Sequence, residues 1–372
     1  MEKKWVHLAA VATIITAGIN IITVLPFMVG AANDYLGYNK IQLGWFAAAD
    51  TSGVMLSGIS TYYLGRRFSL RQLILGGLGI QALLHLISLI LVHPVPLIGV
   101  RFLAGWFGGL AYTAALSYFA RLKRPELGYT SYIIVYSIIS GLLLMIYPYL
   151  LGYSYYFGFG ILFVFTVIAF FMAQRAFPVV SEPAYKPDRQ VLPGVKVGWV
   201  LIAFLFFQCS NSSIYSFSER IGNENGLSPA FLGFSIGFSI FVGLVSGFLV
   251  LILARFLSYA RQIFLGLVLM FGSLIILYFR PGFPLFYLTG ITLLGFGFTI
   301  VLPNLFSVLA SKDPSGSKVA LGTITNWLGQ AAGPAISAWY IAGGNFSEIV
   351  IPGGIFLIFS MLSMFINAFI AK

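Results

Sequence analysis

The sequence predicts an all-α integral membrane protein with twelve transmembrane helices, arranged as two similar halves of six. Three observations carry this prediction. Of 372 residues, 59% are hydrophobic and only 8% are charged, whereas a soluble domain carries about 25% charged residues. The chain contains twelve apolar runs near the roughly 20 residues that one bilayer crossing needs. The third observation is that part of the first half recurs in the second half.

The recurrence is clearest between residues 43–71 and 232–261, which read alike at a fixed offset of 189 residues. Each segment begins with Leu-Gly, carries Ser-Gly further in and ends in a short basic turn. The matched pairs are Leu43 and Leu232, Gly44 and Gly233, Ser57 and Ser246, Gly58 and Gly247, and Arg66 and Arg255. An internal repeat indicates two related domains. We therefore expect the halves to superpose about a pseudo-two-fold axis along the membrane normal.

Taken in order, the apolar runs of the first half predict helices at 5–30, 41–64, 72–92, 97–120, 129–151 and 155–175. The first run is longer than the roughly 7–15 apolar residues of a cleaved signal peptide. The second half predicts helices at 197–219, 229–253, 262–279, 284–310, 319–342 and 348–371.

A linker separates the two predicted six-helix domains, residues 1–175 and 197–372. Four prolines lie in residues 176–196 and exclude a continuous helix there. They are Pro178, Pro183, Pro187 and Pro193. We expect this segment to be cytoplasmic.

The basic residues predict the orientation. If the N-terminus is cytoplasmic, 17 of the 21 Lys and Arg residues fall in cytoplasmic segments, and Lys40, Arg220 and Arg280 remain in outer ones. Such asymmetry places both termini in the cytoplasm, with the protein in the inner or plasma membrane. The net charge of +11 is spread over these turns and forms no basic patch, so we expect no nucleic-acid partner. One cysteine and three dispersed histidines predict neither a disulfide nor a metal site.

Short motifs sharpen the assignment. After the second predicted helix, glycines and arginines occur at the spacing of a known loop motif: Gly58, Gly65, Arg66 and Arg67. Tyr62 and Tyr63 stand where that motif usually has Asp and Arg. The fourth predicted helix carries Arg101 and Gly105 as Arg-x-x-x-Gly. Together with two six-helix halves and a linker, these motifs resemble the major facilitator superfamily of secondary transporters.

The resemblance covers nearly the whole chain. It implies alternating access, in which the halves rock around a substrate bound near the membrane midplane, and a gating role for the loop that carries Arg66 and Arg67. The missing Asp implies a looser gate. The resemblance does not specify the substrate.

Asp50 and Arg101 are the ionisable residues that the sequence places deep in the bilayer. A charged residue at a helix centre costs about 2.5–3.5 kcal/mol on insertion scales, so such residues are functional candidates. The two could pair. One interpretation is a static salt bridge between their helices, and the other is a pair that opens when a proton or an anionic substrate competes for one partner. Glu219, beside Arg220 near the outer end of its helix, fits a solvated rim or a gate.

Polar side chains recur at helical spacing on the helices predicted at 5–30, 197–219 and 319–342, and lipid cannot satisfy their hydrogen bonds. These stripes face either a partner helix or a water-filled cavity. The cavity candidates, including three aromatic residues placed to stack on a planar substrate, are Asn20, Trp45, Gln208, Asn211, Tyr215, Asn326, Trp327 and Gln330. The pairs Gly105–Gly109 and Gly329–Gly333 predict close helix packing.

The sequence therefore predicts a secondary active transporter of a small organic solute. A proton is the first candidate for the coupling ion, because Asp50 and Glu219 are available. The chain has no Gly-x-x-x-x-Gly-Lys-Ser/Thr loop, which argues against ATP as the driver. We expect a monomer whose partners are the solute and the bilayer, with no cofactor.

Two other classes of protein stay open. A non-transporting receptor on the same fold is favoured by the altered loop motif. A membrane-embedded enzyme is favoured less, because H-E-x-x-H and G-x-S-x-G are missing and His85 has no predicted partner.

Overall fold

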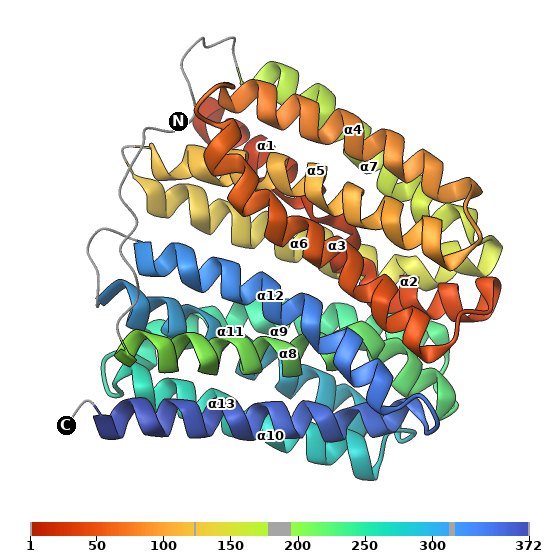
Figure 1. Ribbon diagram of the computed structural model, residues 1–372, viewed down its shortest axis with the longest axis vertical. Coiled ribbons are helices and arrows are strands. Elements are labelled where there is room, and N and C mark those ends of the chain that lie inside the picture. The colour runs from red at the N-terminus through yellow and green to blue at the C-terminus, as the bar shows by residue number, and fades with distance from the viewer. Residues whose placement is uncertain (1, 123, 178–194, 312–316, 371–372) are drawn as a thin grey trace. The chain divides into compact units, whose positions relative to one another are not determined.

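The computed structural model describes residues 2–122, 124–177, 195–311 and 317–370, and the described chain is helical almost throughout (Figure 1). Most of the predicted linker, residues 178–194, lies outside the described residues. Every predicted crossing is occupied by helix, so the all-α, twelve-crossing prediction is confirmed. Within the described ranges, ten helical stretches are long and apolar enough to span a bilayer. The protein is a multi-pass membrane protein.

The helices occur in the predicted order, and their bounds lie close to the predicted ranges. In the first half they are α1 (Glu2–Gly18), α2 (Asn20–Leu36), α3 (Lys40–Leu64), α4 (Leu70–Ile90), α5 (Pro94–Ala120), α6 (Pro125–Tyr153) and α7 (Tyr156–Ala176). In the second half they are α8 (Val195–Glu224), α9 (Pro229–Leu253), α10 (Tyr259–Phe279), α11 (Pro284–Ser311), α12 (Ser317–Tyr340), the short 3₁₀ helix η1 (Phe346–Ile349) and α13 (Val350–Ile370).

The chain forms two compact units. The first comprises Met1–Tyr38, Ala49–Ser140 and Tyr149–Asp188, and the second comprises Asn39–Ala48, Gly141–Pro148 and Arg189–Lys372. Helices α3 and α6 therefore each contribute a segment to both units.

In the first unit, α4 packs against α5 and α7, and α1 packs against the same two helices (Figure 1). Apolar residues from α1, α4, α5 and α7, such as Ile15, Leu78, Ala115 and Phe119, form a buried core between them. Ser69 begins α4 with a capping box, in which its hydroxyl accepts from Gln72 N and its own N–H donates to the Gln72 side chain.

In the second unit, α10 packs against α11 and α13, and α8 packs against α12 and α13. Gly329 and Gly333 of α12 lie against the backbone of α8 at Leu205 and Cys209. A side chain at either glycine would overlap that backbone, so the close packing predicted from their spacing is confirmed.

The internal repeat is visible in the helix bounds themselves. Helix α9 has the bounds of α3 shifted by 189 residues, and α10 has the bounds of α4 shifted by the same number. The serines that begin α4 and α10, Ser69 and Ser258, are also 189 residues apart. The two segments thus fold into the same pair of helices joined by a turn of the same length.

The first crossing is not one helix, which corrects the prediction of a continuous helix at 5–30. Ile19, between α1 and α2, has φ −122° and ψ 24°, which are not helical values. Its N–H donates to the oxygen of Thr16 at 3.3 Å, the short 3₁₀ pattern. The Gly18 carbonyl instead accepts from Gln81 Nε2 of α4 at 3.2 Å. Hydropathy gave the length of the crossing but could not show a side chain from another helix replacing a helical bond.

Candidate functional site

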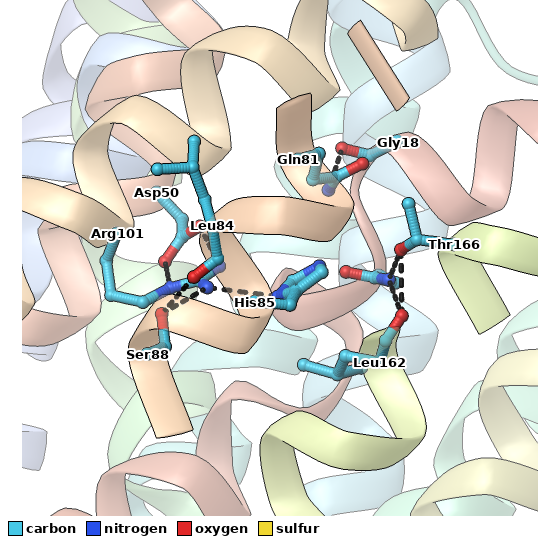
Figure 2. A network of polar contacts seen from close by, with 10 residues as sticks. Gly18, Asp50, Gln81, Leu84, His85, Ser88, Arg101, Leu162 and Thr166 are labelled. Carbon is cyan, nitrogen blue, oxygen red and sulfur yellow. Dashed lines mark hydrogen bonds and ion pairs between the residues drawn. The ribbon is translucent and has the colours of Figure 1, made fainter. Parts of the chain in front are cut away.

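Asp50 of α3 and Arg101 of α5 form a buried ion pair in the first unit (Figure 2). Arg101 Nη2 donates to Asp50 Oδ1 at 2.6 Å and Arg101 Nε donates to Oδ2 at 3.0 Å. The residues are 1% and 0% exposed. Two parallel bonds between a guanidinium and a carboxylate form the strongest pairing available to these side chains. The structure thus contains the Asp50–Arg101 pair that the sequence analysis considered possible.

Helices α3 and α5 come into backbone contact at this point. A Cβ atom on Gly105 would overlap the Asp50 carbonyl oxygen, and one on Gly53 would overlap the carbonyl oxygen of Phe102. Only glycine allows this approach. The close packing predicted for Gly105 is confirmed, and it holds the backbone of Asp50 within reach of Arg101.

His85 and Ser88 of α4 complete the surroundings of the Arg101 guanidinium (Figure 2). Arg101 Nη1 is 3.1 Å from His85 Nδ1 and 3.3 Å from Ser88 Oγ. A guanidinium can only donate, so His85 Nδ1 accepts and the imidazole is neutral with its proton on Nε2. The guanidinium carbon also lies 5.3 Å from the centre of the Phe159 ring. The sequence offered no partner for His85, and the structure supplies Arg101.

The break between α1 and α2 lies beside α4 and α5. Gly18 packs so closely on Gly108 of α5 that neither position has room for a side chain. Beyond the break, Asn20 Nδ2 donates to the Leu162 carbonyl at 3.3 Å and to Thr166 Oγ1 at 2.9 Å, both on α7. Asn20, predicted as a cavity residue, is thus buried between α2 and α7.

Two of the predicted cavity residues meet in the second unit. Gln208 Nε2 of α8 donates to Asn326 Oδ1 of α12, and both side chains are buried. Trp327, next to Asn326, is buried as well. These residues tie α8 to α12 next to the Gly329 contact.

The remaining cavity candidates are more accessible. Asn211, Tyr215 and Gln330 are partly exposed. Trp45, near the start of α3, is 58% exposed. The structure therefore brings Gln208 and Asn326 together, whereas Trp45 is largely exposed.

Glu219 and Arg220 form a second buried ion pair, near the end of α8. Arg220 Nε donates to Glu219 Oε2 at 2.6 Å and Arg220 Nη2 donates to Oε1 at 2.8 Å. Asn223 adds a bond to Oε1 at 2.9 Å. Both charged side chains are buried, so the solvated-rim alternative is wrong. Glu219 stays a candidate gate or coupling group.

In the turn after α3, Arg66 contacts two tyrosines. Arg66 Nη2 donates to the Tyr62 hydroxyl at 2.6 Å, and its guanidinium lies 4.6 Å from the Tyr62 ring centre and 5.8 Å from that of Tyr63. These are the two positions at which the loop motif usually has Asp and Arg. Arg66 and Arg67 are both exposed, and Gly65 is buried.

A cluster of tyrosines escaped the sequence prediction. The hydroxyls of Tyr132 of α6 and Tyr112 of α5 are hydrogen-bonded to each other, and Tyr136 of α6 is hydrogen-bonded to Thr23 and Ser140. The signal was available, because the positions 129, 132, 136 and 140 of α6 carry Tyr, Tyr, Tyr and Ser at the spacing of one helix face. The predicted polar stripes were sought on three other helices, at 5–30, 197–219 and 319–342.

Comparison with known proteins agrees with this architecture. The sequence matches the Major Facilitator Superfamily over residues 8–338. A comparison with curated protein sequences found no match.

Several solved structures have the same fold. The chain is similar to the nucleoside transporter NupG, with a TM-score of 0.75, 11% identity and 99% of both chains covered. A mutant of NupG gives a TM-score of 0.79 at 9% identity, over 99% of this chain and 100% of that one. A mutant of the peptide transporter POT gives 0.77 at 14% identity, over 99% of this chain and 94% of that one. The family match over most of the sequence, together with a fold that agrees with it from end to end, shows that this chain belongs to the Major Facilitator Superfamily.

Proposed function

We propose that the protein is a secondary active transporter that moves a small organic solute by alternating access, with a proton as the coupling ion. The observation that carries the proposal is the Asp50–Arg101 pair, a bidentate ion pair buried inside a bundle of membrane helices. An uncompensated charge there would be costly, so an event that parts the pair must bring Asp50 a substitute for the positive charge of Arg101 and leave the guanidinium with other hydrogen-bond acceptors. A proton on Asp50 is the smallest such substitute.

The coupling step follows from this requirement. With the pair closed, the Arg101 guanidinium satisfies both carboxylate oxygens of Asp50. When α3 and α5 shift relative to one another, Asp50 loses that charge and takes up a proton, which it gives back when the pair closes. His85 and Ser88 keep Arg101 hydrogen-bonded while the carboxylate is away. A static salt bridge would show the same geometry but would carry no proton.

The family and the transporters of similar fold support transport over an enzymatic role. The neighbouring proteins are described as a nucleoside transporter and a peptide transporter, so both solute classes are candidates here. We further propose that the protein is a monomer in the inner or plasma membrane with both termini cytoplasmic, as the distribution of basic residues predicts.

Counterflow in proteoliposomes tests the proposal. A transporter exchanges labelled external solute for preloaded unlabelled solute without an ion gradient, and an inward proton gradient then drives accumulation. Binding without exchange would instead show a receptor built on this fold. Exchange that an imposed pH gradient does not drive would leave transport intact and remove the proton from the mechanism.

A further inference from the structure

The tyrosine cluster forms one continuous surface, which we call the tyrosine surface: Thr23, Tyr112, Tyr132, Tyr136 and Ser140. The Tyr112 and Tyr132 rings meet edge to face with centres 6.5 Å apart, and the centres of the Tyr132 and Tyr136 rings are 5.7 Å apart. Thr23 Oγ1 lies 3.4 Å from Ser140 Oγ. Hydroxyl groups and aromatic rings of α2, α5 and α6 thus lie together within the first unit. Thr23 and Ser140 are buried, and the three tyrosines are partly exposed.

The tyrosine surface does not face lipid. The exposed aliphatic residues of α6 are Ile133, Ile134, Ile138, Leu142 and Ile146, and the last four recur every four residues. At 100° per residue they define one side of the helix, and Tyr132 and Tyr136 lie on the side roughly opposite. Both tyrosines are nevertheless partly exposed. Their exposed edges therefore lie on a side of α6 other than the one that carries these apolar residues.

The helix break borders this surface. A Cβ atom on Gly18 would lie 3.0 Å from the backbone nitrogen and Cβ of Tyr112. Two amide oxygens near the break, Gln81 Oε1 and Asn20 Oδ1, are buried and lack a hydrogen-bond partner among the described residues. Interrupted membrane helices occur where the freed polar groups are buried in protein or line a cavity, and in transporters such helices often border the substrate site. The unpartnered oxygens are acceptors that a ligand hydroxyl or amide can satisfy.

The charge available at this surface is balanced. Among the described residues of the first unit, the buried charged side chains are Asp50 and Arg101, and they neutralise each other. His85 accepts from Arg101 and is neutral. A charged ligand would find no counter-charge here and would lose its hydration. A neutral ligand finds hydroxyls, amide oxygens and aromatic rings.

We propose that the tyrosine surface and the adjoining break recognise the substrate, and that the substrate is an uncharged, hydroxyl-bearing ring compound such as a nucleoside or a monosaccharide. The tyrosine rings stack on the ring of the solute, and the hydroxyls and amide oxygens pair with its polar groups. This inference rests on the proposed transport function, because it names the solute of that same site. It disfavours zwitterionic peptides and carboxylates.

Equilibrium binding to the purified full-length protein tests the substrate class. Uridine represents the nucleosides and glucose the monosaccharides. Dialanine, succinate and putrescine are the zwitterionic, anionic and cationic comparison compounds. We expect a neutral ring compound to bind and the charged compounds not to. Binding of the charged compounds only, or failure of every nucleoside and monosaccharide tried, would overturn the inference.

Single substitutions test the surface itself. Tyr136→Phe keeps the ring and removes the hydroxyl, and should weaken binding by roughly 3- to 10-fold, the worth of one net hydrogen bond. Deoxy analogues of the ligand should lose less affinity on this substitution, so the variant should discriminate less between the ligand and its deoxy analogue. Tyr132→Phe provides a second variant if the first folds poorly. Tyr149→Phe is the matched control, because Tyr149 lies on the exposed side of the same helix.

Unchanged affinity and unchanged discrimination in both Tyr→Phe variants would show that the tyrosines are structural. Counterflow measured on the same protein separates the two proposals. Binding of a neutral ring compound without exchange would support the tyrosine surface as the recognition site and contradict transport. Exchange of charged solutes alone would support transport and contradict the proposed substrate class.

Discussion

Gly105 lies directly against the backbone carbonyl of Asp50, and Arg101, four residues earlier on the same helix, holds the Asp50 carboxylate. Residues four apart share one face of a helix. Helix α5 therefore contacts Asp50 in two ways: Gly105 packs against its backbone carbonyl, and Arg101 pairs with its carboxylate. This explains physically why an arginine and a glycine occur as Arg-x-x-x-Gly, since each needs the other to face the same carboxylate residue.

The close approach predicts that Gly105→Ala will be damaging. The added methyl group would overlap the Asp50 carbonyl and push α3 from α5, at a cost of about 1–3 kcal/mol for an overpacked contact. We expect a lower melting temperature and a loss of transport. Gly99→Ala on the same helix is the control, because a Cβ there meets nothing within 4 Å. Equal behaviour of the two variants would show that the contact is dispensable.

Asp50→Asn separates coupling from folding. The amide keeps the shape and hydrogen-bonding capacity of the carboxyl but cannot exchange a proton. We expect gradient-driven accumulation to be abolished while folding, and solute exchange in counterflow, persist. Accumulation with the wild-type pH dependence would make Asp50 structural and direct attention to Glu219, the next buried carboxylate.

Arg101→Ala should be more harmful than Asp50→Asn. It leaves a buried carboxylate without its partner, which typically costs about 3–5 kcal/mol. His85 and Ser88 would lose their shared donor as well. The double variant carrying Asp50→Asn and Arg101→Ala should recover part of the lost stability, because the stranded charge is gone. Thermal unfolding of the four proteins measures this coupling, and strictly additive effects would refute it.

The turn after α3 should tolerate change better. Arg66 is exposed and held by Tyr62, contacts that are worth about 0.5–1 kcal/mol at such a site. Arg66→Ala should therefore lower the transport rate by only about two- to fivefold. Tyr62→Phe, which keeps the ring, should have a smaller effect. A well-folded Arg66→Ala protein with no transport at all would mean that the turn has a larger role in gating.

The positions of the helices could be read from the sequence, because a bilayer imposes one dominant requirement, a run of apolar residues of fixed length. The same scarcity of charge singled out Asp50 and Arg101, and their pairing followed from helical depth. Asn20 shows the limit of this reasoning. Its place on a polar stripe does not reveal that it bonds to α7, since a stripe facing a helix and a stripe facing water look alike.

Features that depend on a neighbouring helix were not predictable. The end of α1 at Gly18 depends on Gln81, which is remote in sequence, and the partner of His85 is likewise on another helix. The tyrosine surface is different. Its residues are regularly spaced, and a count of hydroxyl-bearing aromatics along one helix face would have found Tyr132 and Tyr136.

The shared bounds of α3 with α9 and of α4 with α10 have a consequence for how this chain can vary. Substitutions have changed most residues between the copies, yet no insertion or deletion separates them over these helices. One added residue would turn everything beyond it by about 100° around the helix axis. Placed between Lys40 and Asp50, it would carry the carboxylate away from α5 while leaving the composition almost untouched. The two copies thus agree in chain length where most of their side chains differ, and segments 40–90 and 229–279 are the natural units for building chimeras.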